Sequence, residues 1–194
     1  MVMAPATKSW TRADVLALPD DGNRYELVDR DLLVTPAPRL MHQRAVWELF
    51  RRLDPYVRSS GFGAVMLSPA DLNLGVEALV QPDLFVAGLR DGREPIEWNE
   101  VGIPLFAVEV LSPSSARHDR VTKRRLYQRT GVPLYWIVDL DARLIEAWTP
   151  TDDQPTVCDV EAVWHAPKAR EPWRLDVPAY FTAVHSSDPP AGSG

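Results

Sequence analysis

The chain has 194 residues, of which 45% are hydrophobic and 25% charged, and its formal net charge is -6. These values are ordinary for a soluble globular protein, and the acidic balance argues against a protein that coats nucleic acid. No stretch reaches the roughly 18 apolar residues that a membrane span needs. The first ten residues do not read as a secretory signal, and the single cysteine, Cys158, fits a reducing compartment. We therefore expect a cytoplasmic protein that makes no contact with a membrane.

The first sixty residues predict helix, strand, strand, helix. SWTRADVLALP (9–19) predicts a short helix with a capping residue at its start. RYELVDRDLLVTPAP (24–38) predicts two short strands around a turn near 29–31. In RLMHQRAVWELFRRLDPYVRSSG (39–61), apolar residues recur at helical spacing and the segment ends at a glycine, so a long helix is expected. Pro55 should kink or interrupt it.

The rest of the chain is rich in strands, apart from one helix at about 117–130 that ends at Gly131. The remainder after 150, to about Phe181, is expected to form short strands and turns. Strands are predicted as two short ones in 63–75, one apolar strand in 78–89 entered through a proline, one in 104–112, and a hairpin of two in 133–150.

This order predicts a mixed α/β fold with one central sheet flanked by helices. We see no internal repeat and no interdomain linker, so residues 1–184 are expected to form a single domain. Residues 185–194, rich in Ser, Pro and Gly, are expected to be a disordered tail.

A carboxylate in the middle of an apolar strand needs an explanation. Glu109 lies within LFAVEVLS, and burying it unpaired would cost several kcal/mol, roughly. It should therefore face water at a strand edge, pair with a cation or bind a metal. Asp83 occupies a similar place in QPDLFVA. If the two strands are neighbours, both carboxylates come within reach of one hard cation such as Mg2+ or Mn2+.

The helix after Glu109 adds a cation. Asp119, Lys123 and Tyr127 follow one another at a spacing of four and share a helix face. The chain has 18 arginines and only three lysines, so a lysine among the arginines of this helix is unusual here. Lysine can polarise or orient an attacking water. The plainer alternatives are an exposed ion pair between Asp119 and Lys123, and packing alone for Tyr127.

Several motifs in this order resemble one family. QPD, EVLSPSS, the D...K...Y...G pattern of the following helix and YWIVD are similar to the Uma-type family of restriction endonucleases, within the PD-(D/E)XK nuclease superfamily. The resemblance spans most of the chain and implies a restriction-endonuclease-like core. It implies a metal-dependent phosphodiesterase with Asp83, Glu109 and the backbone carbonyl of Val110 as metal ligands.

One position departs from the superfamily pattern. The lysine expected two residues after the glutamate is replaced by Leu111. In families like this one the lysine comes from the following helix, which fits Lys123. The resemblance also makes Glu26 and His42 supporting candidates, since acidic and histidine residues recur at these places. Asp119 is a third supporting candidate. The plainer interpretation of His42 is a surface or capping residue.

Three functions remain open on the sequence. The first is a Mg2+-dependent DNA endonuclease. The second is a catalytically inactive nuclease fold that binds nucleic acid or protein, which the leucine at 111 and the acidic charge favour. The third is a nuclease selective for RNA or for DNA structure.

Arginines in the 117–131 helix, with Arg44, Arg51 and Arg52, could contact phosphates along a nucleic acid or simply form a solvated face. Nucleases of this architecture often act as dimers, which lets them cut both strands of a DNA duplex. A homodimer is therefore also expected.

Overall fold

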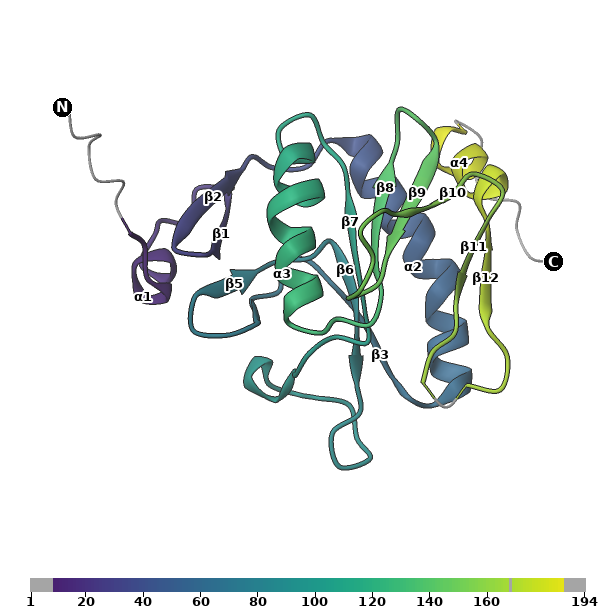
Figure 1. Ribbon diagram of the computed structural model, residues 1–194, viewed down its shortest axis with the longest axis horizontal. Helices are drawn as coiled ribbons and strands as arrows, with labels where there is room; N and C mark the ends of the chain where they lie inside the picture. Colours follow the sequence, from purple (N-terminus) through teal and green to yellow (C-terminus); the bar gives the residue numbers. More distant parts are fainter. Residues whose placement is uncertain (1–8, 168, 187–194) are drawn as a thin grey trace.

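A mixed sheet of six strands lies at the centre of the fold (Figure 1). The computed structural model describes residues 9–167 and 169–186. The central strands are β3 (Gly63–Leu67), β6 (Leu84–Gly88), β7 (Phe106–Val110), β8 (Tyr135–Asp139), β9 (Leu144–Trp148) and β10 (Thr156–Cys158). Their order is β10-β9-β8-β7-β6-β3. The pair β7 and β8 is parallel and the other neighbours are antiparallel, so the expected mixed central sheet is confirmed.

Two smaller sheets complete the strand content of the described residues. The first has the order β2-β1-β5-β4 and the second pairs β11 with β12. Their bounds are β1 (Arg24–Val28), β2 (Asp31–Thr35), β4 (Leu72–Asn73), β5 (Ala78–Val80), β11 (Glu161–Trp164) and β12 (Trp173–Asp176).

The single strand expected in 78–89 is wrong, because this stretch forms β5 in one sheet and β6 in another. The division falls at Gln81 and Pro82. Proline has no N–H for a strand ladder, and the Gln81 N–H donates to the Glu26 side chain, to Oε1 at 2.7 Å. The chain therefore leaves the small sheet at this point and enters the central one.

Helical segments connect and cover the sheets. They are α1 (Arg12–Leu16), α2 (Leu40–Ser60), the short 3-10 helix η1 (Trp98–Glu100), the π-helix η2 (His118–Lys123), α3 (Arg124–Arg129) and α4 (Val177–His185). The expected helix at 117–130 is thus a π-helical turn that continues into α3. Thr11 caps α1, with Asp14 completing the capping box.

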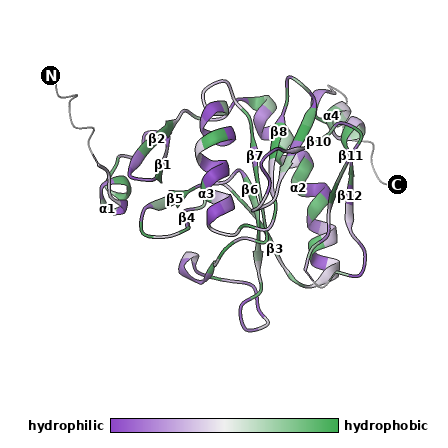
Figure 2. Ribbon diagram, viewed as in Figure 1, coloured by the Kyte–Doolittle hydropathy of each residue, from purple (hydrophilic) through white to green (hydrophobic). Residues whose placement is uncertain are grey.

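The central sheet separates two hydrophobic layers. Alternate residues of its strands face opposite sides. Leu84, Val108 and Trp136 face α2, α4 and the β11-β12 pair. Phe85, Ala107 and Tyr135 face α3 and the four-stranded sheet. In Figure 2 the central strands are mostly hydrophobic, whereas α2 and α3 carry both hydrophobic and hydrophilic residues, as expected for helices with one buried side.

Helix α2 follows its sequence pattern closely. Its buried side is formed by Ala45, Leu49, Leu53 and Val57. It ends at Gly61, which has the left-handed φ of 63° expected of a glycine cap. The expected interruption at Pro55 is wrong, because α2 is one element through this residue. Packing of the buried side against the sheet outweighs the one backbone hydrogen bond that proline removes.

The last described segment differs from expectation. Residues 177–185 form α4, where short strands and turns were predicted. Tyr180, Phe181 and Val184 favour strands by intrinsic preference, but here they form a buried helix side against α2. The expected tail begins at His185, which instead is the last residue of α4; residues 187–194 lie outside the described residues. Within 9–167 and 169–186, no helix has the length and apolarity of a bilayer span.

Candidate active site

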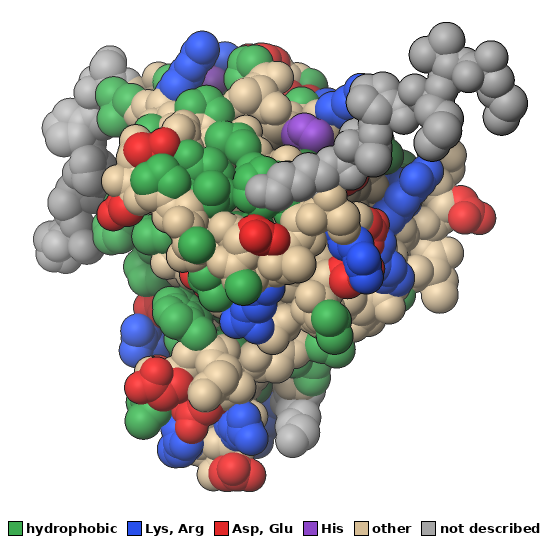
Figure 3. Space-filling model, turned by 90° about the vertical axis from the view of Figure 1, so that its left-hand side faces the viewer, with side chains coloured by type: hydrophobic (Ala, Val, Ile, Leu, Met, Phe, Trp, Pro, Cys, Tyr) green, Lys and Arg blue, Asp and Glu red, His purple; other side chains and the backbone are tan. Residues whose placement is uncertain are grey.

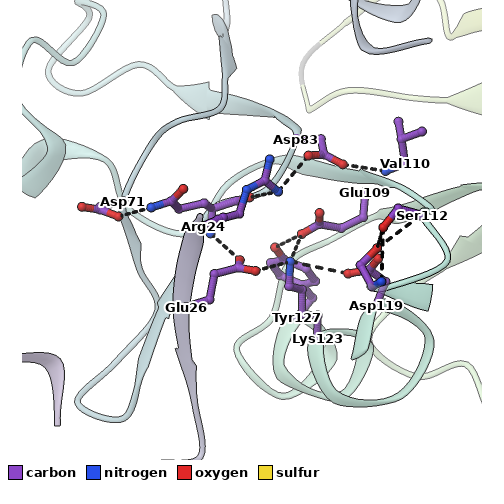
Figure 4. Close-up of polar contacts among 12 residues, drawn as sticks. Arg24, Glu26, Asp71, Asp83, Glu109, Val110, Ser112, Asp119, Lys123 and Tyr127 are labelled. Carbon is purple, nitrogen blue, oxygen red and sulfur yellow. Dashed lines mark hydrogen bonds and ion pairs between the residues drawn. The ribbon is translucent and has the colours of Figure 1, made fainter. Parts of the chain in front are cut away.

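Ionisable side chains from separate elements are buried together beside the central sheet (Figure 4). Glu26 and Arg24 come from β1, His42 from the first turns of α2, Asp83 from the residue before β6, and Glu109 from β7. The next two, Asp119 and Lys123, come from η2. The four carboxylates are at most 3% exposed and Lys123 is 2% exposed. Burial of this many charged groups is rare unless they are paired or bind a ligand.

Asp83 and Glu109 lie on the same side of the sheet. Leu84 pairs with Val108 in the antiparallel register of β6 and β7. Continuing that register by one residue sets Asp83 opposite Glu109, and directly opposed residues project from the same face. Both side chains line one cavity of about 180 Å³. The residues that cover this cavity include Pro36 to Arg39, from the β2-α2 connection, and Ser112 to Ser115.

Asp83 is fixed by three neighbours. Its Oδ2 accepts hydrogen bonds from the Val110 N–H at 2.8 Å and from His42 Nε2 at 3.0 Å. Its Oδ1 lies 2.9 Å from Arg24 Nη1. Burial by itself would raise the pKa of Asp83, but the hydrogen bond from His42 and the charge of Arg24 outweigh burial and hold the pKa well below its usual value. Asp83 is therefore an ionised carboxylate.

Lys123 lies among three carboxylates. Its Nζ is 2.7 Å from Glu26 Oε2, 3.0 Å from Glu109 Oε1 and 3.5 Å from Asp119 Oδ1. Burial would lower the pKa of Lys123, but these carboxylates outweigh burial and raise the pKa well above its usual value. The ammonium is thus charged and held in place. The alternative of an exposed ion pair with Asp119 is wrong, because both side chains are buried.

Glu109 has a second partner besides Lys123. The Tyr127 hydroxyl donates to Glu109 Oε1 at 3.1 Å, so Tyr127 does more than pack. Burial raises the pKa of Glu109 well above its usual value, Lys123 opposes this, and the neighbouring Asp83, Asp119 and Glu26 add to it. Glu109 thus resists ionisation in this structure mainly because it is buried, and also because other carboxylates lie around it.

The predicted supporting residues differ in where they lie. His42 lines the cavity and contacts Asp83, so the plainer interpretation of a surface or capping residue is wrong. Glu26 is absent from the cavity lining and lies behind it, in contact with Lys123 and with the Gln81 N–H. Arg24 was missed by sequence reasoning. A signal was present, since Arg24 and Glu26 are two apart on one strand and share a face.

A comparison with family models decides the family. The model described as "Uma2: Putative restriction endonuclease" matches residues 12–178. The chain belongs to the Uma2 family. The resemblance to the Uma-type family in the sequence is thereby confirmed. Comparison with curated proteins gave no match.

Among solved structures, this Uma2 family member is similar to a protein described as "a putative nuclease belonging to DUF820" from Anabaena variabilis ATCC 29413. The two share 20% sequence identity with a TM-score of 0.71, and the match covers 90% of this chain and 98% of that chain. At this identity the likeness concerns the fold alone. It confirms the expected α/β, nuclease-like architecture.

The donor set of this Uma2 site fits a hard divalent cation. Four buried carboxylates face only two fully charged cations, Arg24 and Lys123, so two negative charges would be uncompensated if all ionised. Asp83 Oδ1 is buried, and its contact among the described residues is the ion pair with Arg24 at 2.9 Å. An excess of buried carboxylate oxygen is the setting that Mg2+ or Mn2+ prefers.

No group of three or more His, Cys, Asp or Glu side chains in the described ranges is placed so that it could hold a metal ion. Mg2+ commonly uses one or two protein carboxylates and keeps several waters, so two carboxylates are a sufficient set.

The backbone carbonyl of Val110 is a further candidate oxygen ligand. The N–H of the same residue faces Asp83, whereas the next N–H, of Leu111, bonds to Val138 on the other side. Because the N–H and C=O of one strand residue face the same side, the Val110 carbonyl faces the Asp83 side.

Most of the candidate phosphate-binding arginines are engaged elsewhere. Arg51 and Arg52 pair with Glu48, and Arg44 donates to carbonyls of 183 and 186 near the end of α4. In the 117–131 segment, Arg120 pairs with Asp139 and Glu146, and Arg129 with Asp29. On the face shown in Figure 3, Lys and Arg side chains are interspersed with Asp and Glu. A phosphate-tracking role for Arg44, Arg51 and Arg52 therefore finds no support.

Proposed function

We propose that this Uma2 family member is a nuclease that hydrolyses DNA phosphodiester bonds with Mg2+ or Mn2+. The observation that carries the proposal is the opposed pair Asp83 and Glu109, on one cavity, with Lys123 Nζ 3.0 Å from Glu109. The family description and the nuclease-like fold support it. Residues 1–184 would act as one nuclease domain, and Cys158, a free thiol, fits work in the cytoplasm.

Asp83, Glu109 and the Val110 carbonyl would hold the metal. When bound, the metal lowers the pKa of water and neutralises phosphate charge. The remaining chemistry belongs to the side chains around it. His42 and the Val110 N–H fix the orientation of Asp83, and Tyr127 fixes that of Glu109.

Lys123 would orient the attacking water or bind a phosphate oxygen. Glu26 and Asp119 hold its ammonium at one place beside Glu109, which lowers the entropy lost when substrate binds. Leu111 stands where the superfamily pattern has lysine, and Lys123 reaches the same carboxylate from η2 instead. The departure at 111 is therefore compatible with catalysis.

A cleavage assay with matched variants tests the proposal. Supercoiled, linear and single-stranded DNA are incubated with Mg2+ or Mn2+ and with wild-type protein, Glu109→Gln or Glu161→Gln. Glu109→Gln keeps the side-chain size but removes the charge, so cleavage should fall by about 100-fold or more. Glu161 has an exposed side chain on β11 and pairs with Arg174, so its variant should cleave like wild type.

Two results would separate this proposal from its alternatives. If the protein neither cleaves DNA nor binds metal through its carboxylates, it is the inactive binding module. Cleavage of RNA, or of branched DNA only, would keep the proposed chemistry but change the proposed substrate.

A homodimer is also proposed, because cutting both strands needs two such sites. Light scattering in solution should then give the mass of two chains.

A further inference from the structure

Arg24 is a buried cation with no role in the function proposed above. It is the first residue of β1 and lines the same cavity as Asp83 and Glu109. Its Nη1 donates a hydrogen bond to the Gln81 carbonyl at 3.1 Å and lies 2.9 Å from Asp83 Oδ1 (Figure 4). Its side chain is 17% exposed and forms part of the cavity wall.

The two oxygens of Asp83 are used differently. Oδ2 accepts the hydrogen bonds from His42 and from the Val110 N–H. Oδ1 receives no hydrogen bond among the described residues and is in charge contact with Arg24. A metal that uses Asp83 without breaking its two hydrogen bonds must therefore bind Oδ1. This is the oxygen that Arg24 covers.

The attraction that holds Arg24 would weaken when a metal binds. Burial would lower the pKa of Arg24, but Asp83, Glu109 and Glu26 outweigh it and raise the pKa. The guanidinium is thus stabilised by the same carboxylates that would hold a divalent ion. Two added positive charges beside it would weaken that attraction and compete with Arg24 for Asp83 Oδ1. A guanidinium released from Oδ1 presents planar N–H donors that match a phosphate group.

We propose that Arg24 is a counter-ion built into the metal-free site, that a divalent metal displaces it from Asp83 Oδ1, and that the released guanidinium then binds the substrate phosphate. This inference rests on the proposed function. It gives Arg24 two opposite effects, since the side chain weakens metal binding and strengthens catalysis. An ion pair that only joined β1 to the residue before β6 would neither weaken metal binding nor strengthen catalysis.

The test measures Mn2+ binding and DNA cleavage separately. Isothermal titration with Mn2+ alone compares wild type, Arg24→Gln and Arg174→Gln, a control that removes a charge from an exposed ion pair. Arg24→Gln should bind Mn2+ about tenfold more tightly or better, because the competing cation is gone. The same variant should cleave DNA about 100-fold more slowly in kcat/KM. Arg174→Gln should match wild type in both, and circular dichroism checks folding.

The outcomes are separable from failure of the proposed function. If wild type binds Mn2+ and cleaves DNA, but Arg24→Gln binds Mn2+ no more tightly, the inference alone is overturned. If neither protein binds Mn2+, the proposed function is overturned together with it. A crystal structure of wild type with Mn2+ tests the displacement without any variant. Arg24 should have left Asp83 Oδ1, and a guanidinium still in contact with that oxygen would refute the inference.

Discussion

Lys123 is the residue on which the buried charges depend most. Its ammonium contacts Glu26, Glu109 and Asp119 with only 2% of the residue exposed. Lys123→Gln would leave these carboxylates without their cation. Removing one partner of a buried ion pair costs about 3–5 kcal/mol, and we expect a loss of that order in the free energy of unfolding, together with loss of cleavage.

Urea denaturation of Lys123→Gln beside Arg174→Gln measures this effect. Arg174 forms an exposed pair with Glu161, and removing such a pair costs about 1 kcal/mol or less. Equal losses for the two variants would show that the buried cluster does not depend on the lysine charge.

At the residue scale, the sequence predicted the members of the site better than their contacts. Residue type and strand periodicity were enough to select Asp83 and Glu109, and an unusual lysine pointed to Lys123. Arg24 was missed because arginine is common in this chain: its position two residues before Glu26 shows a shared strand face, but not that this face lies against the site. The Tyr127 hydroxyl bond to Glu109 depends on how η2 and α3 pack on the sheet, which periodicity does not determine.

At the scale of elements, α4 depends on a single capping side chain. Asp176 accepts a hydrogen bond from the Ala179 N–H at 2.8 Å, and the Tyr180 hydroxyl anchors the helix to the Ala45 carbonyl of α2 at 3.0 Å. Asp176→Ala should lower the free energy of unfolding by about 1 kcal/mol, the usual cost of losing an N-cap. Metal affinity should not change, since α4 covers the sheet face opposite the site.

Thermal or urea unfolding checks this prediction against Asp159→Ala. Asp159 is an exposed acidic residue in the turn before β11, so its removal takes away the same charge without a helix cap. If both variants lose the same stability, the cap of α4 contributes nothing beyond general charge.

Elements with strong local signals were predicted well, and those set by tertiary contacts were not. The hairpin of β1 and β2 and the buried side of α2 follow from turn residues and helical spacing. The division between β5 and β6 depends on which sheet each segment joins, and that information is not local. The π-helical turn of η2 has no compositional signature, although such turns are frequent at functional sites.

At the scale of the whole molecule, buried tyrosines set a limit to stability in alkali. Burial raises the pKa of Tyr127, Tyr135 and Tyr180 above the ordinary value. In the unfolded chain a tyrosine loses its proton near pH 10, roughly. Above that pH the unfolded state binds fewer protons than the folded state. Stability is therefore unaffected by these groups below pH 10 and falls as the pH rises, by up to about 1.4 kcal/mol per pH unit for each.

Urea midpoints measured from neutral to alkaline pH, with ultraviolet absorbance of tyrosinate as a second signal, test this dependence. Tyr180→Phe removes one of the three groups and should flatten the decline. A midpoint that stays constant well above pH 10 would contradict the burial of these hydroxyls.

The route of the chain between β7 and β8 has one further consequence. These two strands are parallel, so a crossover must join them, and that crossover carries Lys123, while Asp83 and Glu109 remain on the sheet. Lys123 and the two carboxylates thus belong to different segments of the chain. Local loosening of residues 118–129 would withdraw Lys123 together with Tyr127, so Glu109 would lose both of its side-chain partners, while His42 and the Val110 N–H would still hold Asp83.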